Sequence, residues 1–179
     1  MNSLHTLTES ESGLGHVVEE QRLDVHGLLE SLVRHGVQFV LIGGAAAHIL
    51  DLPVPATIDV DITPLKSRLN LERLANFFED VHAALFFGDV NGTWFPRRPT
   101  ENWAQYDTLH LLTQFGLLDI VFTPSGTTRG YEDLVDEAIH ADLQSVHIRV
   151  ISEPQWIFLK QSTGREKDID HLRRYFNES

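Results

Sequence analysis

The stretch Thr57-Ile58-Asp59-Val60-Asp61-Ile62 decides the fold that we expect for this 179-residue chain. Side chains of a β-strand alternate between its two faces, so Asp59 and Asp61 project from one face while Val60 and Ile62 enter the core. Two parallel carboxylates on an otherwise apolar strand are costly unless they are paired or bound to a metal. A divalent cation such as Mg²⁺ is the expected partner, because Mg²⁺ is commonly held by one or two carboxylates together with substrate phosphates.

A glycine turn lies a short distance before this strand. Residues 37–42 form an apolar run of strand length, and Gly43-Gly44 connects that run to the helix-forming residues 45–50. Because glycine has no Cβ, the backbone N–H groups of such a turn can approach a phosphate closely. We therefore expect Gly43 and Gly44 to bind the phosphates of a nucleotide.

A third carboxylate lies inside another apolar stretch, Leu117-Leu118-Asp119-Ile120-Val121-Phe122. Asp119 has no polar neighbour in this stretch, so its charge also needs a partner. If this strand pairs near the Asp59 strand, the three carboxylates converge and can hold one or two Mg²⁺ ions. The sequence thus predicts a metal site formed by Asp59, Asp61 and Asp119.

Apolar periodicity outlines the remaining elements. We expect further strands over residues 109–113 and 146–151, joined to the others by loops that include residues 86–106. Helices are expected over residues 21–35, 69–85 and 131–142, followed by one or two helices within 153–176. Residues 1–22 form a predicted N-terminal tail and residues 23–179 a single domain, in which 143–179 supply a closing strand and a helical segment.

The charge of the chain restricts its partners. Fourteen basic and 26 acidic side chains give a net charge of −12, which argues against extended DNA binding because proteins that grip a phosphate backbone carry a basic stripe. Residues 160–174 are locally basic, with five Lys or Arg against three Asp or Glu, and suit a triphosphate or one RNA end. No apolar run reaches the roughly 20 residues that span a bilayer, so we expect no membrane partner. The polar start and the absence of cysteine favour a cytoplasmic location.

These motifs together resemble one family of enzymes. The chain is similar to the minimal nucleotidyltransferases of the DNA polymerase beta superfamily, and in particular to their AbiEii or MenT-like toxin branch. The resemblance covers residues 23–175 and rests on Phe39-Val40-Leu41-Ile42-Gly43-Gly44, Thr57-x-Asp59-x-Asp61, Gly116-Leu117-Leu118-Asp119, Gly130-Tyr131-Glu132-Asp133-Leu134 and Lys160-x₄-Arg165-x-Lys167-Asp168. It implies an α/β fold of the α+β type, a nucleotidyltransferase fold with a short mixed sheet backed by helices and a C-terminal helical segment.

The resemblance also implies roles for individual residues. Asp59 and Asp61 would bind Mg²⁺ or Mn²⁺, while Asp119 would complete the site and help to activate the acceptor hydroxyl. Lys160 would contact the triphosphate of the NTP, and Asp168 would orient either Lys160 or the acceptor. The chain departs from relatives at Gly44, where many carry serine, and at residues 55–56, where relatives often carry an arginine.

The implied reaction transfers a nucleoside monophosphate from an NTP to an acceptor. In the toxin relatives the acceptor is a tRNA 3′ end, which would make this chain one half of a toxin–antitoxin pair with a cognate antitoxin protein. Two alternatives remain open on the sequence alone. The acceptor is a protein side chain or a small molecule such as an aminoglycoside, which the acidic charge suits better, or the domain is catalytically silent and binds a partner protein.

Overall fold

A mixed eight-stranded sheet forms the centre of the protein. The computed structural model describes residues 22–85, 93–94 and 106–178, so the predicted tail except Arg22 and most of the predicted loop region 86–106 lie outside the described residues. The strands are ordered β4-β3-β5-β6-β2-β1-β8-β7 across the sheet. Their bounds are β1 (Phe39–Ile42), β2 (Asp59–Pro64), β3 (Ala84–Leu85), β4 (Thr93–Trp94), β5 (Thr108–Thr113), β6 (Gly116–Val121), β7 (Ile139–Leu143) and β8 (Val146–Val150).

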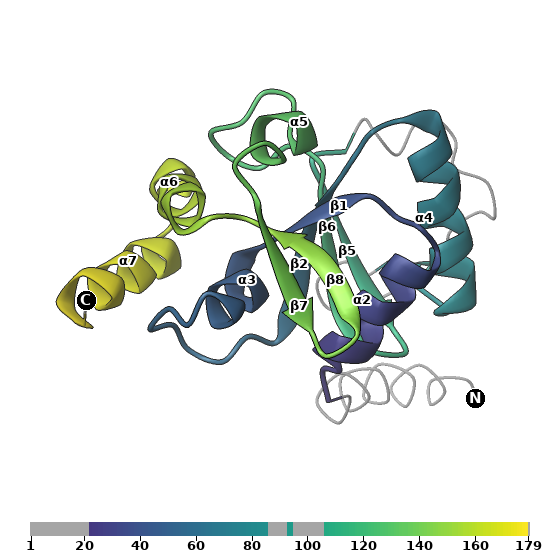
Figure 1. Cartoon of the computed structure of the whole chain (residues 1–179), viewed down its shortest axis with the longest axis horizontal. Helices are drawn as coiled ribbons and strands as arrows, with labels where there is room; N and C mark the ends of the chain where they lie inside the picture. Colours follow the sequence, from purple (N-terminus) through teal and green to yellow (C-terminus); the bar gives the residue numbers. More distant parts are fainter. Residues whose placement is uncertain (1–21, 86–92, 95–105, 179) are drawn as a thin grey trace, which may run out of the picture.

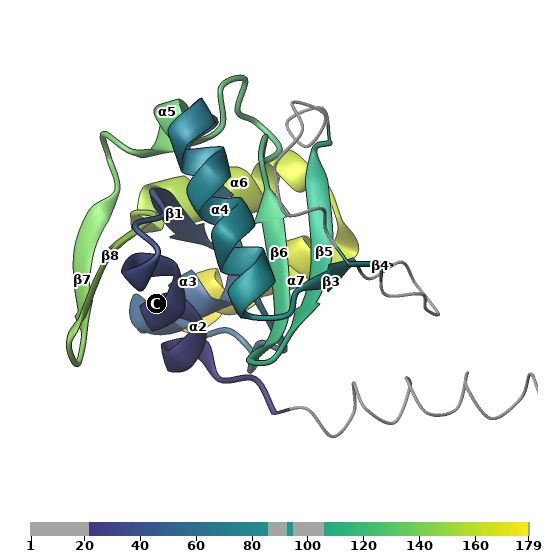
Figure 2. The ribbon, with the colours of Figure 1, turned by 90° about the vertical axis from the view of Figure 1, so that its right-hand side faces the viewer.

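Helices cover both faces of this sheet. They are α2 (Val25–Arg34), α3 (Gly43–Ile49), α4 (Arg68–Asp80), α5 (Tyr131–Leu134), α6 (Glu153–Thr163) and α7 (Glu166–Glu178). Figures 1 and 2 show α2 and α4 on one side of the sheet and α6 and α7 on the other. No helix within the described ranges is long and apolar enough to cross a membrane.

The strand that carries Asp59 and Asp61 lies in the middle of the sheet. Strand β2 pairs in antiparallel register with β1 and in parallel register with β6. Val60 and Ile62 are fully buried, whereas Asp59 and Asp61 on the opposite face are partly exposed, as the alternation predicts. The core beneath them consists of apolar side chains from the central strands together with α2 and α4, which pack on that face.

Local signals explain where several helices begin and end. Helix α2 ends before Gly36, whose φ of 68° is the left-handed conformation that terminates helices. Helix α6 begins with a capping box formed by Ser152 and Gln155. It ends before Gly164, which is also left-handed, with a φ of 64°. A single residue separates Gly164 from the first residue of α7.

The predicted helix over residues 131–142 is wrong in its second half. Helix α5 ends at Leu134, and Ile139–Leu143 forms β7, which pairs with β8 in a hairpin. Ile139, Ala141 and Leu143 alternate with two polar side chains, which is the period of a strand. The predicted helix over 69–85 also ends early, because α4 stops at Asp80 and Ala84–Leu85 pairs with β5 as strand β3.

Candidate active site

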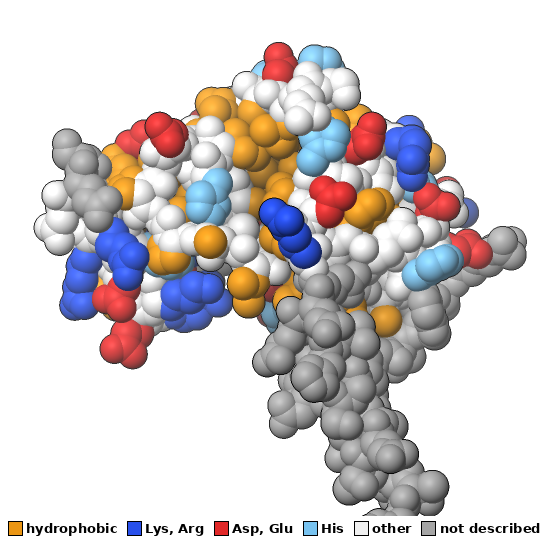
Figure 3. Space-filling view, turned by 90° about the horizontal axis from the view of Figure 1, so that it is seen from below, with side chains coloured by type: hydrophobic (Ala, Val, Ile, Leu, Met, Phe, Trp, Pro, Cys, Tyr) orange, Lys and Arg blue, Asp and Glu red, His pale blue; other side chains and the backbone are white. Residues whose placement is uncertain are grey.

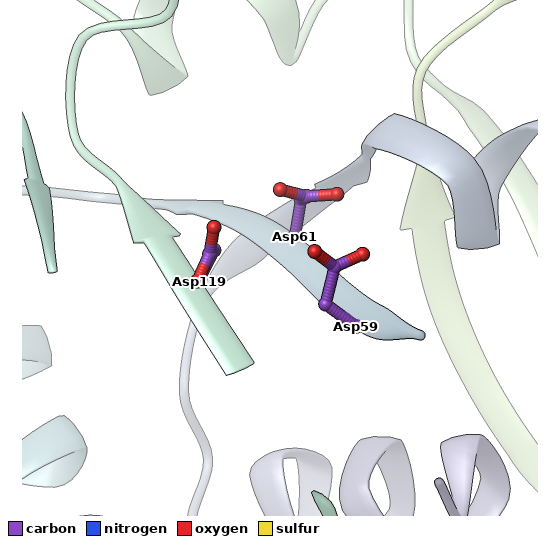
Figure 4. Close-up of side chains that lie close together, drawn as sticks. All are labelled: Asp59, Asp61 and Asp119. Carbon is purple, nitrogen blue, oxygen red and sulfur yellow. The ribbon is translucent and has the colours of Figure 1, made fainter. Parts of the chain in front are cut away.

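Three carboxylates from two neighbouring strands meet on one face of the sheet. The parallel ladder between β2 and β6 sets Asp61 opposite Asp119, and Asp59 lies two residues before Asp61 on the same face. Each of the three residues offers a carboxylate oxygen that lies within 4.8 Å of the others'. Figure 4 shows the three groups projecting from β2 and β6 toward one space. The structure therefore brings together the three acids that the sequence singles out.

The electrostatics of Asp61 disfavour its charged form. Burial raises the pKa of Asp61 from 3.8 to about 7, and repulsion from Asp59 and Asp119 adds to that effect. Lys160 and Lys167 oppose the rise without cancelling it. Without a cation, the site thus disfavours the full negative charge of all three acids, which is the condition that a bound divalent ion would relieve.

His110 holds Asp119 from the adjacent strand. Strands β5 and β6 pair so that His110 lies opposite Asp119, and the His110 Nδ1–H donates a hydrogen bond of 2.8 Å to Asp119 Oδ1. Burial raises the pKa of Asp119, whereas the hydrogen bond and the charge of His110 lower it. His110 thereby fixes one oxygen of Asp119 and leaves the other available toward Asp59 and Asp61.

The glycine turn leaves room for these acids. Gly43 has a φ of 68°, and a Cβ at this position would lie 1.9 Å from Asp61 Oδ2. A Cβ on Gly44 would lie 2.7 Å from the Thr57 hydroxyl. That hydroxyl lies 2.9 Å from Asp59 Oδ1, to which it can donate a hydrogen bond, and 3.0 Å from the Asp59 carbonyl oxygen. The absence of side chains at residues 43 and 44 therefore allows Asp61 and Thr57 to occupy their positions.

Helices α6 and α7 place a cationic wall beside the acids. Lys160 Nζ lies 2.5 Å from Asp168 Oδ1, while Thr163 and Arg165 donate to Asp168 Oδ2 at 2.6 and 2.8 Å. The Asp168 side chain is only 1% exposed. Burial alone would raise its pKa, but hydrogen bonds and the Lys160 charge outweigh burial and lower the pKa to about 2. Asp168 is thus an ionised residue that positions Lys160.

The acids and the cationic wall line one cleft. This cleft has a volume of about 800 Å³ and includes every residue predicted for the site, namely Gly43, Gly44, Asp59, Asp61, Asp119, Lys160 and Asp168. It also includes further basic side chains at Arg165, Lys167 and Arg174. Lys and Arg side chains gather at the end of the molecule formed by α6 and α7, at the left of Figure 3. The cleft therefore has an acidic floor beside a basic wall.

Two contributors to the site are absent from the sequence-based prediction. His110 could have been found by counting back from the tight turn between β5 and β6, since Thr113 pairs with Gly116 and His110 then meets Asp119. Thr57 belongs to the predicted motif but has no predicted role of its own, although a hydroxyl two residues before Asp59 is within reach of its carboxylate.

Comparison with known proteins identifies the architecture. No family model and no curated protein matches the sequence. Solved structures with a similar fold include TM1012 of Thermotoga maritima, described as a nucleotidyltransferase, at 16% identity and a TM-score of 0.51 over 98% of both chains. The lincosamide antibiotic adenylyltransferase LnuA, in its lincomycin-bound structure, matches at 16% identity and a TM-score of 0.55 over 96% of this chain and 98% of LnuA. The antibiotic-resistance factor ANT(2″)-Ia matches at 14% identity and a TM-score of 0.54 over 86% of this chain and 81% of the ANT(2″)-Ia chain.

The fold is therefore that of the nucleotidyltransferases, as the sequence predicts. None of these three structures represents the AbiEii or MenT-like branch, so the resemblance to that branch stays a hypothesis.

Proposed function

We propose that this protein is a nucleotidyltransferase that transfers a nucleoside monophosphate from an NTP to a hydroxyl acceptor and releases pyrophosphate. One observation carries the proposal: Asp59, Asp61 and Asp119 share a single cleft with Lys160 and the basic side chains around it. An acidic cluster beside a cationic wall suits a metal-bound triphosphate, because the ion and the basic groups together balance its charge.

The donor set fits Mg²⁺ or Mn²⁺. All three groups are carboxylates, which are the ligands that these hard cations prefer. Burial, and then repulsion from Asp59 and Asp119, raises the pKa of Asp61, and a cation would offset both effects. When bound, a divalent ion supplies charge neutralisation at the phosphates and lowers the pKa of a nearby hydroxyl.

The residues of the cleft have separate roles in the proposed reaction. The acceptor oxygen forms a bond to the α-phosphorus as the bond from that phosphorus to the pyrophosphate oxygen breaks. Under this proposal Asp119, which His110 contacts, accepts the proton that the acceptor hydroxyl loses. Lys160, fixed by Asp168, provides positive charge for the triphosphate. Gly43 and Gly44 line the cleft and, under this proposal, face the phosphates.

The acceptor takes one of two forms. The resemblance to the toxin branch favours a tRNA 3′ end, and the Lys160–Asp168 contact agrees with the motif on which that resemblance rests. The alternative is a protein side chain or a small hydroxyl compound. The net charge of −12 and the likeness of the fold to two antibiotic-related proteins favour the small compound. A toxin role would further require a cognate antitoxin protein.

Labelled NTPs provide the test. The purified protein is incubated with each α-phosphate-labelled NTP, Mg²⁺ or Mn²⁺, and in separate reactions total RNA, cellular protein or a panel of amine-bearing hydroxyl compounds. We expect label in one acceptor class only with a divalent ion, no transfer by Asp61→Asn, and normal transfer by Asp136→Asn, which changes an exposed acid outside the cleft.

The outcomes separate the alternatives. Label in RNA supports the tRNA form of the proposal, and label in a protein or a small compound supports the alternative acceptor. If no acceptor is labelled and neither the metal nor any NTP raises the melting temperature, the enzyme proposal fails in favour of a catalytically silent, partner-binding domain.

A further inference from the structure

Strand β7 forms an edge of the sheet with one unpaired side. It pairs with β8 on its inner side, and within the described chain no strand pairs with its outer side. Figure 2 shows β7 at the outer margin of the molecule. Edge strands are commonly protected from further pairing by Lys, Pro or a bulge, yet Ile139-His140-Ala141-Asp142-Leu143 contains neither residue and its register with β8 is regular. Among the residues that the structure describes, nothing therefore closes this edge to another strand.

The hairpin geometry determines which backbone groups face outward. Gln144 and Ser145 form a two-residue turn between Leu143 and its partner Val146. The residues that flank such a turn exchange hydrogen bonds with each other, and bonded and non-bonded pairs then alternate along the ladder. The N–H and C=O groups of Ile139, Ala141 and Leu143 thus point toward β8. Those of His140 and Asp142 point away from the sheet.

The sequence of β7 is complementary to itself in antiparallel register. We propose that a second copy of this chain pairs with β7 about a two-fold axis at Ala141, which joins the two sheets into one. His140 then lies opposite Asp142 of the second copy, and their outward backbone groups form hydrogen bonds in both directions. Ile139, which is 41% exposed, lies opposite Leu143 of the second copy.

Each pairing in this register is favourable. Asp142 Oδ1 already contacts His147 Nδ1 of the same chain at 2.5 Å, so the second copy's His140 meets its other oxygen. The two Ile139–Leu143 contacts cover apolar surface. Moving the two-fold axis by one residue, to Asp142 or His140, would set two Asp142 or two His140 side chains opposite each other, so these side chains select the register. Because the contact involves one short strand, we expect a weak dimer that forms at high protein concentration.

Paired charge changes test the proposal through the self-association constant, measured by sedimentation velocity up to about 500 µM. His140→Asp alone sets Asp against Asp, and Asp142→Lys alone removes the acceptor. Each is expected to weaken the dimer by about tenfold or more. The double variant H140D/D142K restores opposite charges across the axis and is expected to recover the dimer. The proposal would be overturned if the wild type stays monomeric, or if the double variant self-associates no more strongly than the single variants.

A cysteine pair provides a second readout that depends on the register. The natural chain has no cysteine, so an introduced one meets no competing thiol. In the proposed dimer the two Ala141 residues form a non-hydrogen-bonded pair, whose Cα atoms lie about 4.5 Å apart, within the range for a disulfide. Under mild oxidation Ala141→Cys is expected to form covalent dimers readily, and the exposed turn variant Ser145→Cys is expected not to. Equal yields from both variants would refute the proposed register.

Discussion

Replacing Asp61 by asparagine is expected to stabilise the metal-free protein at alkaline pH. The carboxamide keeps the shape of the side chain and removes the charge that the site disfavours. The pKa of Asp61 rises from 3.8 to about 7 on folding. At a pH above both values, this rise corresponds to about 4 kcal/mol of lost stability in the wild type, since one pKa unit is about 1.4 kcal/mol.

The pH dependence gives this prediction its sign. Below about pH 4 the Asp61 carboxyl is protonated in both states and costs nothing. Between pH 4 and pH 7 the folded protein retains the proton that the unfolded chain releases, so wild-type stability falls as the pH rises. The asparagine of Asp61→Asn does not titrate, so the variant does not show this fall in stability. Its advantage over the wild type should therefore grow from near zero at pH 4 to about 4 kcal/mol at pH 8.

Urea denaturation in the presence of a chelator, repeated from pH 4.5 to pH 8.5, measures this difference. Asp136→Asn serves as the matched control, because it changes an exposed acid and should leave the free energy of unfolding within about 0.5 kcal/mol. Adding Mg²⁺ at pH 8 should stabilise the wild type and leave Asp61→Asn unchanged. A difference below about 1 kcal/mol at pH 8, or one that does not vary with pH, would refute the electrostatic account.

Three further substitutions test neighbouring parts of the site. Gly43→Ala places a Cβ 1.9 Å from Asp61 Oδ2, so we expect the free energy of unfolding to fall by about 3 kcal/mol. An unchanged urea midpoint would show that this contact does not crowd the site. Thr57→Val removes the hydroxyl beside the Asp59 carboxylate and should weaken Mn²⁺ binding about tenfold by calorimetry, with Thr57→Ser retaining affinity. Asp168→Asn breaks a buried ion pair and should cost about 3 kcal/mol at pH 7. Because the pKa of Asp168 is lowered to about 2, that cost should shrink as the pH falls below about 4, and equal costs at pH 7 and pH 3 would argue against it.

Local periodicity was sufficient to predict the acidic face of the site. Asp59 and Asp61 alternate with buried Val60 and Ile62, and this pattern depends only on the strand period. The position of Asp119 beside them required an assumption about strand pairing, which the ladder between β2 and β6 confirms. The convergence of the three carboxylates was thus predictable, because each lies on a strand whose buried face is clear from the sequence.

Contacts set by distant parts of the chain were harder to predict. The segment from Tyr131 to Leu143 contains apolar residues at spacings that suit a helix, and only pairing with β8 makes its second half a strand. The role of His110 likewise depends on the register between β5 and β6. Arg165 reaches Asp168 because a left-handed glycine lets the chain turn between α6 and α7.

Under the proposed function, the parallel ladder that sets Asp61 opposite Asp119 separates the catalytic acids from the residues that select the acceptor. The spacing of these acids is determined by backbone hydrogen bonds between two central strands, and a slip of one residue would turn Asp119 toward the core. The rest of the cleft includes connecting segments such as residues 54–56 and 123–125. Those segments can change in length or sequence without moving the acids. If the proposed function holds, a new acceptor specificity can therefore be engineered into this chain by redesigning its loops while the strands are left unchanged.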